Sequence, residues 1–132
     1  MKLRNRLAKK IMIFDGAMGT VLQQRGLKAG DVPEKMNIEE SREIIDIHKS
    51  YINAGAEIIT TNTFGANKLK LKDTDYSVED IINAAVENAK TAVSESDKDT
   101  KIALDMGPLG ELLEPMGSLS FDEAYELYKE QV

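Results

Sequence analysis

The chain has 132 residues, of which 42% are apolar and 30% are charged, a mixture that is typical of a globular protein rather than a disordered one. Its net charge of -6 leaves no surplus of Lys and Arg to neutralise phosphates, so nucleic-acid binding is disfavoured. The sequence contains no cysteine, which excludes a disulfide framework and a thiolate metal site built from these residues.

The first ten residues, MKLRNRLAKK, are strongly basic, as the start of a targeting peptide would be. The apolar run that follows, Ile11 to Phe14, ends at Asp15, whereas a secretory signal needs about 7 to 15 apolar residues and a membrane span about 20. We therefore expect a basic helix that leads into the first strand, no membrane association and a cytoplasmic location.

Three short apolar runs have the character of buried parallel strands, because each is too continuous for a half-exposed antiparallel strand. They cover residues 11–14, 58–61 and 102–104. Helical spacing separates them, since apolar residues recur every three or four positions between 44 and 52 and again between 81 and 93. The only histidine, His48, lies on the first of these stripes, and we interpret it as a packing residue rather than a ligand.

Local signals mark where the helices begin and end. Ser77 stands three residues before Asp80, and Ser120 three residues before Glu123, as a capping box requires. Gly55 follows the first long helix and fits a C-terminal cap. The expected order is strand, helix, strand, helix, strand, helix, which predicts an α/β architecture.

The strand starts, near residues 11, 58 and 102, are spaced at about 45 residues per βα unit, and eight such units would have on the order of 350 residues, within the range of a (β/α)8 barrel. The last helix, which begins at Ser120, reaches Val132 without a stop signal. We therefore interpret residues 1–132 as a single unit, the N-terminal part of a truncated barrel with about three βα units. Its open sheet edges predict self-association. The alternative is a small complete doubly wound α/β ligand-binding domain, which the length alone would allow.

Each predicted strand ends in polar residues followed by glycine. The three segments begin at Asp15, Thr60 and Asp105. The carboxyl ends of parallel strands are where barrels and open sheets build their sites, so three such ends favour one shared site over three unrelated turns.

The residues alone leave the roles of these side chains open. Asp15 could hold a substrate ammonium group or cap the turn through Gly16. Asn62 and Thr63 could contact a polar ligand or satisfy loop backbone groups, and Asp105 is equally ambiguous.

Taken together, three segments carry a family resemblance: DGAMGT at 15–20, AGAEIITTNTFGAN at 54–67 and DMGPLGELLEPMG at 105–117. In this order and spacing they resemble the homocysteine S-methyltransferase family, and most closely the N-terminal homocysteine-binding module of cobalamin-dependent methionine synthases. The resemblance extends from about Ile11 to the end of the chain. It implies a (β/α)8 barrel whose mouth binds homocysteine beside a zinc ion held by three cysteines.

The resemblance also implies which residues bind the substrate. Asp15 matches the partner of the substrate amino group, Gly16 supplies backbone, and Asn62, Thr63 and Asp105 are expected at the mouth. None of them is expected to be a catalytic residue or a metal ligand, since the zinc cysteines would lie downstream and zinc itself would activate the thiol.

The implied reaction is the transfer of a methyl group, from methylcobalamin or methyltetrahydrofolate, to zinc-activated homocysteine, which gives methionine. The expected partners are homocysteine, the remainder of the barrel, and downstream modules that carry folate and cobalamin. Residues 1–132 alone are expected to be inactive.

Overall fold

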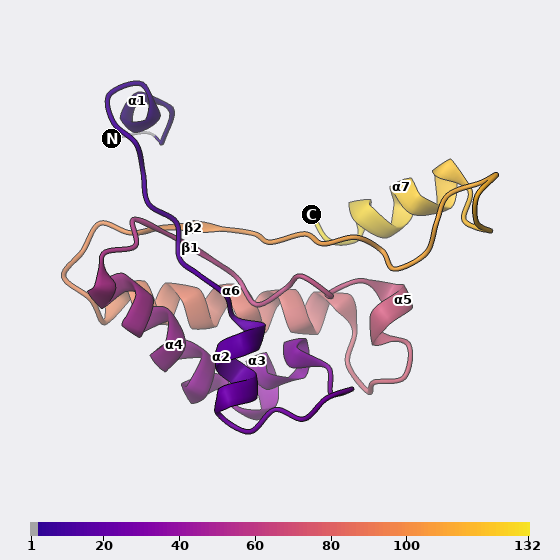
Figure 1. Cartoon of the computed structure of the whole chain (residues 1–132), viewed down its shortest axis with the longest axis horizontal. Helices are drawn as coiled ribbons and strands as arrows, with labels where there is room; N and C mark the ends of the chain where they lie inside the picture. The colour runs from indigo at the N-terminus through magenta and orange to yellow at the C-terminus, as the bar shows by residue number, and fades with distance from the viewer. Residues whose placement is uncertain (1–2) are drawn as a thin grey trace.

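A computed structural model describes residues 3–132, which form one sheet with the two longest helices packed on one of its sides (Figure 1). The two strands are β1 (Ile58–Thr60) and β2 (Lys101–Ala103). The helices, in chain order, are α1 (Leu3–Leu7), α2 (Gly19–Gln24), the 3-10 turn η1 (Pro33–Lys35), α3 (Met36–Glu39), α4 (Ser41–Ala54), α5 (Lys68–Leu71), α6 (Val78–Ser94) and α7 (Phe121–Lys129).

The sheet is parallel and its strands follow chain order. β1 pairs with β2 with Ile59 opposite Ile102, and the other edge of β1 receives the N-terminal segment through a parallel bridge between Phe14 and Ile58. The Asp15 amide donates to the Ile58 carbonyl at 2.9 Å. The spatial order is therefore segment 11–14, then β1, then β2.

The predicted strands at 58–61 and 102–104 are confirmed with bounds that differ by one residue, but burial is confirmed for the first alone, because Ile102 and Leu104 are 36% and 38% exposed. The predicted buried strand at 11–14 is confirmed as a parallel neighbour of β1, but it is neither a full strand nor buried as a whole. Residues 11–14 form only the single bridge at Phe14, and Ile11 and Ile13 are 92% and 61% exposed. The physical reason is that this segment has one neighbouring strand, and nothing in the described part of the chain covers the face to which these two side chains point.

The helix signals are confirmed. Gly55 ends α4 with φ 114°, a left-handed conformation that glycine adopts at little cost. Ser77 and Asp80 form a complete capping box at the start of α6, and Ser120 and Glu123 form another at the start of α7. The predicted basic helix corresponds to α1, and residues 1–2 lie outside the described part.

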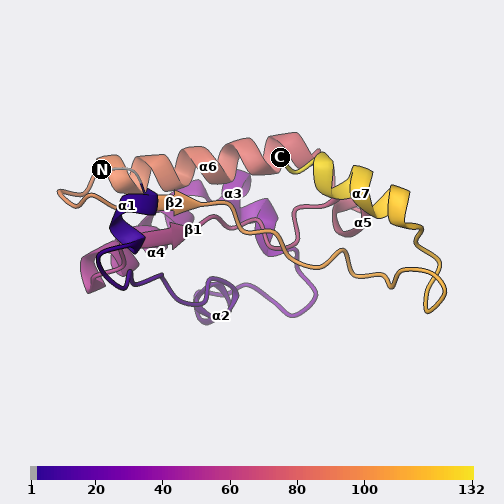
Figure 2. The ribbon, with the colours of Figure 1, turned by 90° about the horizontal axis from the view of Figure 1, so that it is seen from above.

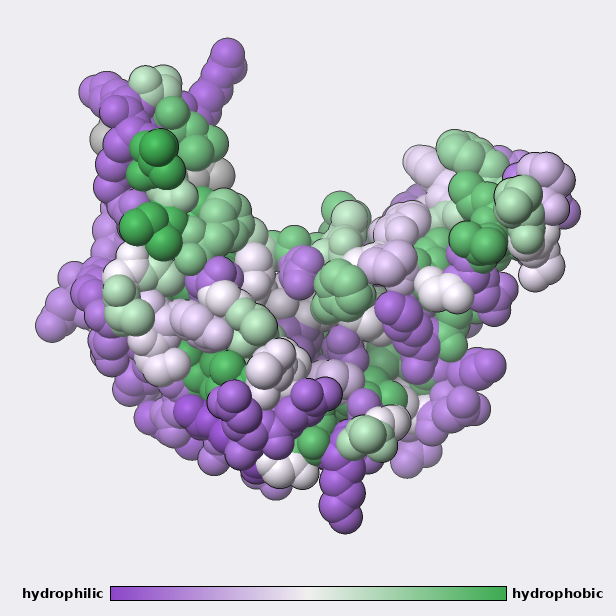
Figure 3. Space-filling view, in the orientation of Figure 1, coloured by the Kyte–Doolittle hydropathy of each residue, from purple (hydrophilic) through white to green (hydrophobic). Residues whose placement is uncertain are grey.

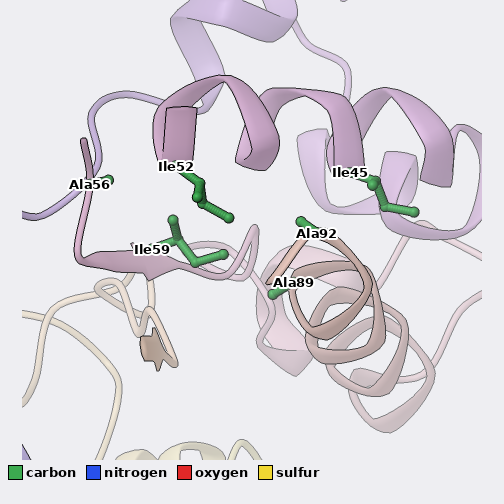
Figure 4. Packing of buried hydrophobic residues seen from close by; sticks show 6 residues of the cluster. All are labelled: Ile45, Ile52, Ala56, Ile59, Ala89 and Ala92. Carbon is green, nitrogen blue, oxygen red and sulfur yellow. The ribbon is translucent and has the colours of Figure 1, made fainter. Parts of the chain in front are cut away.

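The main core lies between α4, α6 and the inner face of β1. Figure 4 shows side chains from the three elements converging there. Ile45 and Ile52 of α4 meet Ile59 of β1, and the small side chains of Ala89 and Ala92 let α6 approach closely. Each buried isoleucine contributes about 1.5–3 kcal/mol by leaving water, so this contact fixes where β1 sits against the helices.

The opposite face of the sheet is uncovered. In Figure 1, α4 and α6 lie on the same side of the strands, and in the view from above the strands run between these two helices (Figure 2). The space-filling view is hollowed between the arms formed by the N-terminal segment and by α7 (Figure 3). Exposed apolar side chains border the strands, among them Ile13, Leu104 and Met106. Within the described residues, no helix has the length and apolar character needed to cross a membrane.

Candidate functional site

A cavity of about 360 Å³ lies at the carboxyl ends of the strands. Its walls come from the turn after Phe14, the start of α2, the turn η1, and the loops that follow β1 and β2. The lining residues are Gly16, Ala17, Met18, Gly19, Thr20, Pro33, Glu34, Thr60, Thr61, Asn62, Thr63, Phe64 and Asp105.

A chain of hydroxyl groups joins the loop after β1 to the loop after β2. Thr63 Oγ1 donates to the carbonyl of Asp105 at 2.7 Å, and Thr61 Oγ1 accepts from the Asp105 amide at 3.2 Å. The two hydroxyl oxygens are 2.6 Å apart. Since the Thr63 proton already goes to the Asp105 carbonyl, Thr61 is the donor between them. The hydrogen bonds of Thr61 and Thr63 therefore set the position of Asp105.

Asp15 connects the end of the N-terminal segment to β1. Its Oδ2 accepts from the Thr60 amide at 2.9 Å and its Oδ1 from the Thr60 hydroxyl at 3.0 Å. Burial raises the pKa of Asp15, the hydrogen bonds from Thr60 lower it, and the charge of Asp105 raises it; the net direction is upward. Asp15 is half-buried beside the cavity, with both carboxylate oxygens engaged by Thr60.

Two asparagines hold the turn η1 against the end of β1. The Asn62 side chain donates to the Pro33 carbonyl at 2.9 Å. The Asn37 side chain donates to the carbonyls of Glu34 at 2.9 Å and Asn62 at 2.7 Å. Because all three acceptors are backbone groups, this network fixes the main chain of the turn rather than one rotamer.

Glu34 is the charged lining residue that sequence reasoning missed. It is only 5% exposed, and its Oε1 accepts from the amide of Gly65 at 2.6 Å. Glu34 does not follow a strand, and the only nearby signal is Pro33, which marks the start of a turn. Nothing local in the sequence indicates that this carboxylate turns inward.

The cavity lining is acidic. Glu34 and Asp105 contribute carboxylates, and burial raises the pKa of Asp105. The lining contains no Lys, Arg or His. A cationic group on a small ligand would therefore be favoured here over an anionic one.

The residues present do not fit a zinc site of the kind that the family resemblance implies. The chain has no cysteine and one histidine, and that histidine, His48, is fully buried in α4, as a packing role predicts. No group of three or more potential metal ligands occurs among the described residues. We therefore derive no chemical step through zinc from residues 1–132.

A larger cavity, of about 600 Å³, lies at the opposite end of the strands beside α1. It is rich in cationic residues, but several of them are engaged: Arg6 pairs with Asp99, Lys10 pairs with Glu57, and Lys98 donates to the carbonyls that end α4, at 2.7 and 3.0 Å. Strand amino ends are also not where α/β proteins build their catalytic sites, so we assign the candidate site to the acidic cavity.

Four of the five predicted site residues line this one cavity: Gly16, Asn62, Thr63 and Asp105. The fifth, Asp15, lies beside it and contacts Thr60, which does line it. The three strand ends thus meet at a single site, although the ligand roles of the five residues stay predictions.

Comparison with known proteins gives the family. Residues 12–132 match the homocysteine S-methyltransferase family. The chain belongs to this family. The methionine synthases of Mycobacterium leprae and Mycobacterium tuberculosis are 31% and 30% identical to it over 138 aligned positions, which cover 94% of this chain.

Solved structures of the homocysteine methyltransferase MmuM from Escherichia coli agree with this assignment. The oxidised form is 28% identical with a TM-score of 0.70, covering 82% of this chain and 41% of that one, and the metallated form is 28% identical with a TM-score of 0.69. This chain spans 11% of the length of the two methionine synthases and less than half of the two MmuM chains.

Proposed function

We propose that residues 1–132 form the first three βα units of a (β/α)8 barrel that binds homocysteine and catalyses its methylation to methionine. The observation that carries this proposal is the convergence of Gly16, Asn62, Thr63 and Asp105 on one acidic cavity at the strand carboxyl ends, in a member of the homocysteine S-methyltransferase family.

The strand order supports a barrel over the doubly wound alternative. A doubly wound sheet reverses its strand order at a switch point and carries helices on both faces. Here the order follows the chain without reversal, and α4 and α6 lie on the same side (Figure 1). Right-handed connections that continue in one direction close into a barrel, whose remaining strands and outer helices would cover the exposed side chains of Ile13 and Leu104.

The substrate proposal rests on charge. Homocysteine carries an ammonium group, which the carboxylates of this cavity would attract, and Asp15 and Asp105 are the residues we propose for its amino end. Gly16 would offer backbone groups, and Asn62 and Thr63 would hold the walls of the site. We propose cobalamin or folate as methyl donors on other modules, zinc ligands outside residues 1–132, and a cytoplasmic location.

The test is binding and metal content measured together. We expect residues 1–132 to bind homocysteine weakly, with resonance shifts at Gly16, Thr63 and Asp105, and to retain no zinc after dialysis. A chain extended through its downstream coding sequence should retain one zinc and release a proton on mixing with homocysteine. Absence of homocysteine binding in both chains would reject the proposed function, and stoichiometric zinc in the short chain would contradict our reading of the metal site.

A further inference from the structure

Glu34 combines deep burial with an incomplete set of partners. Its Oε1 accepts from the Gly65 amide at 2.6 Å. Its Oε2 accepts no hydrogen bond from the described residues. This oxygen is nevertheless not fully sealed from solvent. Since Glu34 lines the cavity, this second oxygen is available to a ligand there.

Gly65 provides the space that Glu34 occupies. A β-carbon at position 65 would lie 2.8 Å from Oε1 and 3.2 Å from Oε2, closer than side-chain atoms normally approach. The carboxylate therefore lies directly over the Gly65 backbone, and any side chain larger than hydrogen at this position would displace it.

No cation of the described residues compensates this carboxylate: the ion pairs of the structure involve other acids. A buried charge without a partner is costly. A ligand cation at Oε2 would supply the missing partner by a charge-assisted hydrogen bond, which is stronger than a neutral one.

We propose that Glu34 binds the ammonium group of the amino-acid substrate through Oε2 and so selects amino-acid thiols over thiols that lack an amino group. This inference rests on the proposed homocysteine site and adds Glu34 to its predicted residues. Asp15 has both carboxylate oxygens engaged by Thr60, whereas Glu34 has one oxygen available. The hydrogen bonds from Asn37 and Asn62 to the turn η1 hold Glu34 in place before the ligand arrives, which reduces the entropy lost on binding.

The experiment compares homocysteine with 4-mercaptobutanoate, which has the same thiol and carboxylate but no ammonium group. In Glu34→Gln the side-chain amide oxygen can still accept from the Gly65 amide, so the fold is retained, while the negative charge is removed. We expect this variant to bind homocysteine about 10- to 100-fold more weakly, with little change in affinity for 4-mercaptobutanoate. Gly65→Ala, which displaces the carboxylate, should show the same selective loss.

The matched control is Glu40→Gln, which removes one negative charge from an exposed acid on the same connecting segment and should leave both affinities unchanged. Circular dichroism and the thermal midpoint verify that each variant is folded. If the wild-type chain binds homocysteine and Glu34→Gln binds it equally well, the inference about Glu34 is overturned while the proposed function stands. If homocysteine binds neither residues 1–132 nor the chain extended through its downstream coding sequence, the proposed function fails first and the inference falls with it.

Discussion

At the scale of single residues, His48 has the clearest consequence for stability. The side chain is fully buried, neither ring nitrogen has a hydrogen-bond partner among the described residues, and burial lowers its pKa to about 4. Below pH 6.5, His48 is protonated in the unfolded chain but stays neutral in the folded chain until the pH approaches 4. Stability conferred by His48 is therefore complete above pH 6.5 and is lost as the pH falls toward 4.

We predict that this loss amounts to roughly 3 kcal/mol between pH 6.5 and pH 4 and that His48→Leu abolishes it. Urea unfolding of both proteins across this range measures the effect. The raised pKa values of Asp15 and Asp105 act in the opposite direction, but they are shared by the two proteins, so the difference between the curves reports His48. Parallel curves for wild type and variant would contradict the prediction.

Asp15 is the second residue whose contacts allow a prediction. Asp15→Ala leaves the Thr60 amide and hydroxyl without their acceptors, which should cost about 1–3 kcal/mol of unfolding free energy. Asp15→Asn keeps an acceptor for the amide and should cost less. Chemical denaturation of both variants separates this structural role from any ligand role, and an Ala variant as stable as the Asn variant would show that the contact with Thr60 is unimportant.

At the scale of elements, two capping boxes of the same chemistry stand in different surroundings. The α6 helix packs against α3, α4 and β2, whereas α7 contributes to a small satellite cluster formed with Leu109 and Leu119. A cap on α6 therefore supports the main core, and a cap on α7 supports a peripheral unit that can open separately.

We predict that Ser77→Ala lowers the global free energy of unfolding by about 1 kcal/mol. Ser120→Ala should change the global value less and should instead speed amide hydrogen exchange within α7. Denaturant titration and residue-resolved exchange of the two variants provide the comparison. Equal global losses for both would mean that α7 unfolds together with the core.

At the scale of the whole molecule, the exposed apolar surface around the sheet is the feature that governs association. Strand-bordering apolar side chains that a closed barrel would bury are exposed in this chain, including Ile13, Leu104 and Met106. The outer edges of segment 11–14 and of β2 pair with no strand among the described residues. Such a surface favours association with another copy.

We predict that residues 1–132 associate in a concentration-dependent way in sedimentation velocity, and that Ile13→Lys shifts them toward the monomer. Ile13 is largely exposed, so the substitution should cost little monomer stability. The matched control is Asn83→Lys, which adds the same charge at an exposed position of α6 and should leave the association unchanged. A wild-type chain that stays monomeric at all concentrations would refute the prediction.

The sequence by itself determined the elements whose signals are local. Apolar spacing predicted α4 and α6, Ser77 and Ser120 marked helix starts, and Gly55 marked a helix end, because each of these depends on neighbours within one or two turns. The strand-end motifs predicted the family through their resemblance to it. They also predicted four residues that line the cavity, since parallel strands bring their carboxyl ends to one edge.

Tertiary structure decided what depends on distant neighbours. The segment 11–14 has strand character but forms a single bridge, because pairing and burial need neighbours that the described residues do not supply. Asp15 is bonded by Thr60, 45 residues away in sequence, and Glu34 turns inward because Gly65, 31 residues further on, leaves room for it and donates to it. These long-range contacts decide that both carboxylate oxygens of Asp15 accept hydrogen bonds and that one oxygen of Glu34 does not. Residues so far apart in sequence become neighbours only when the sheet and its helices pack.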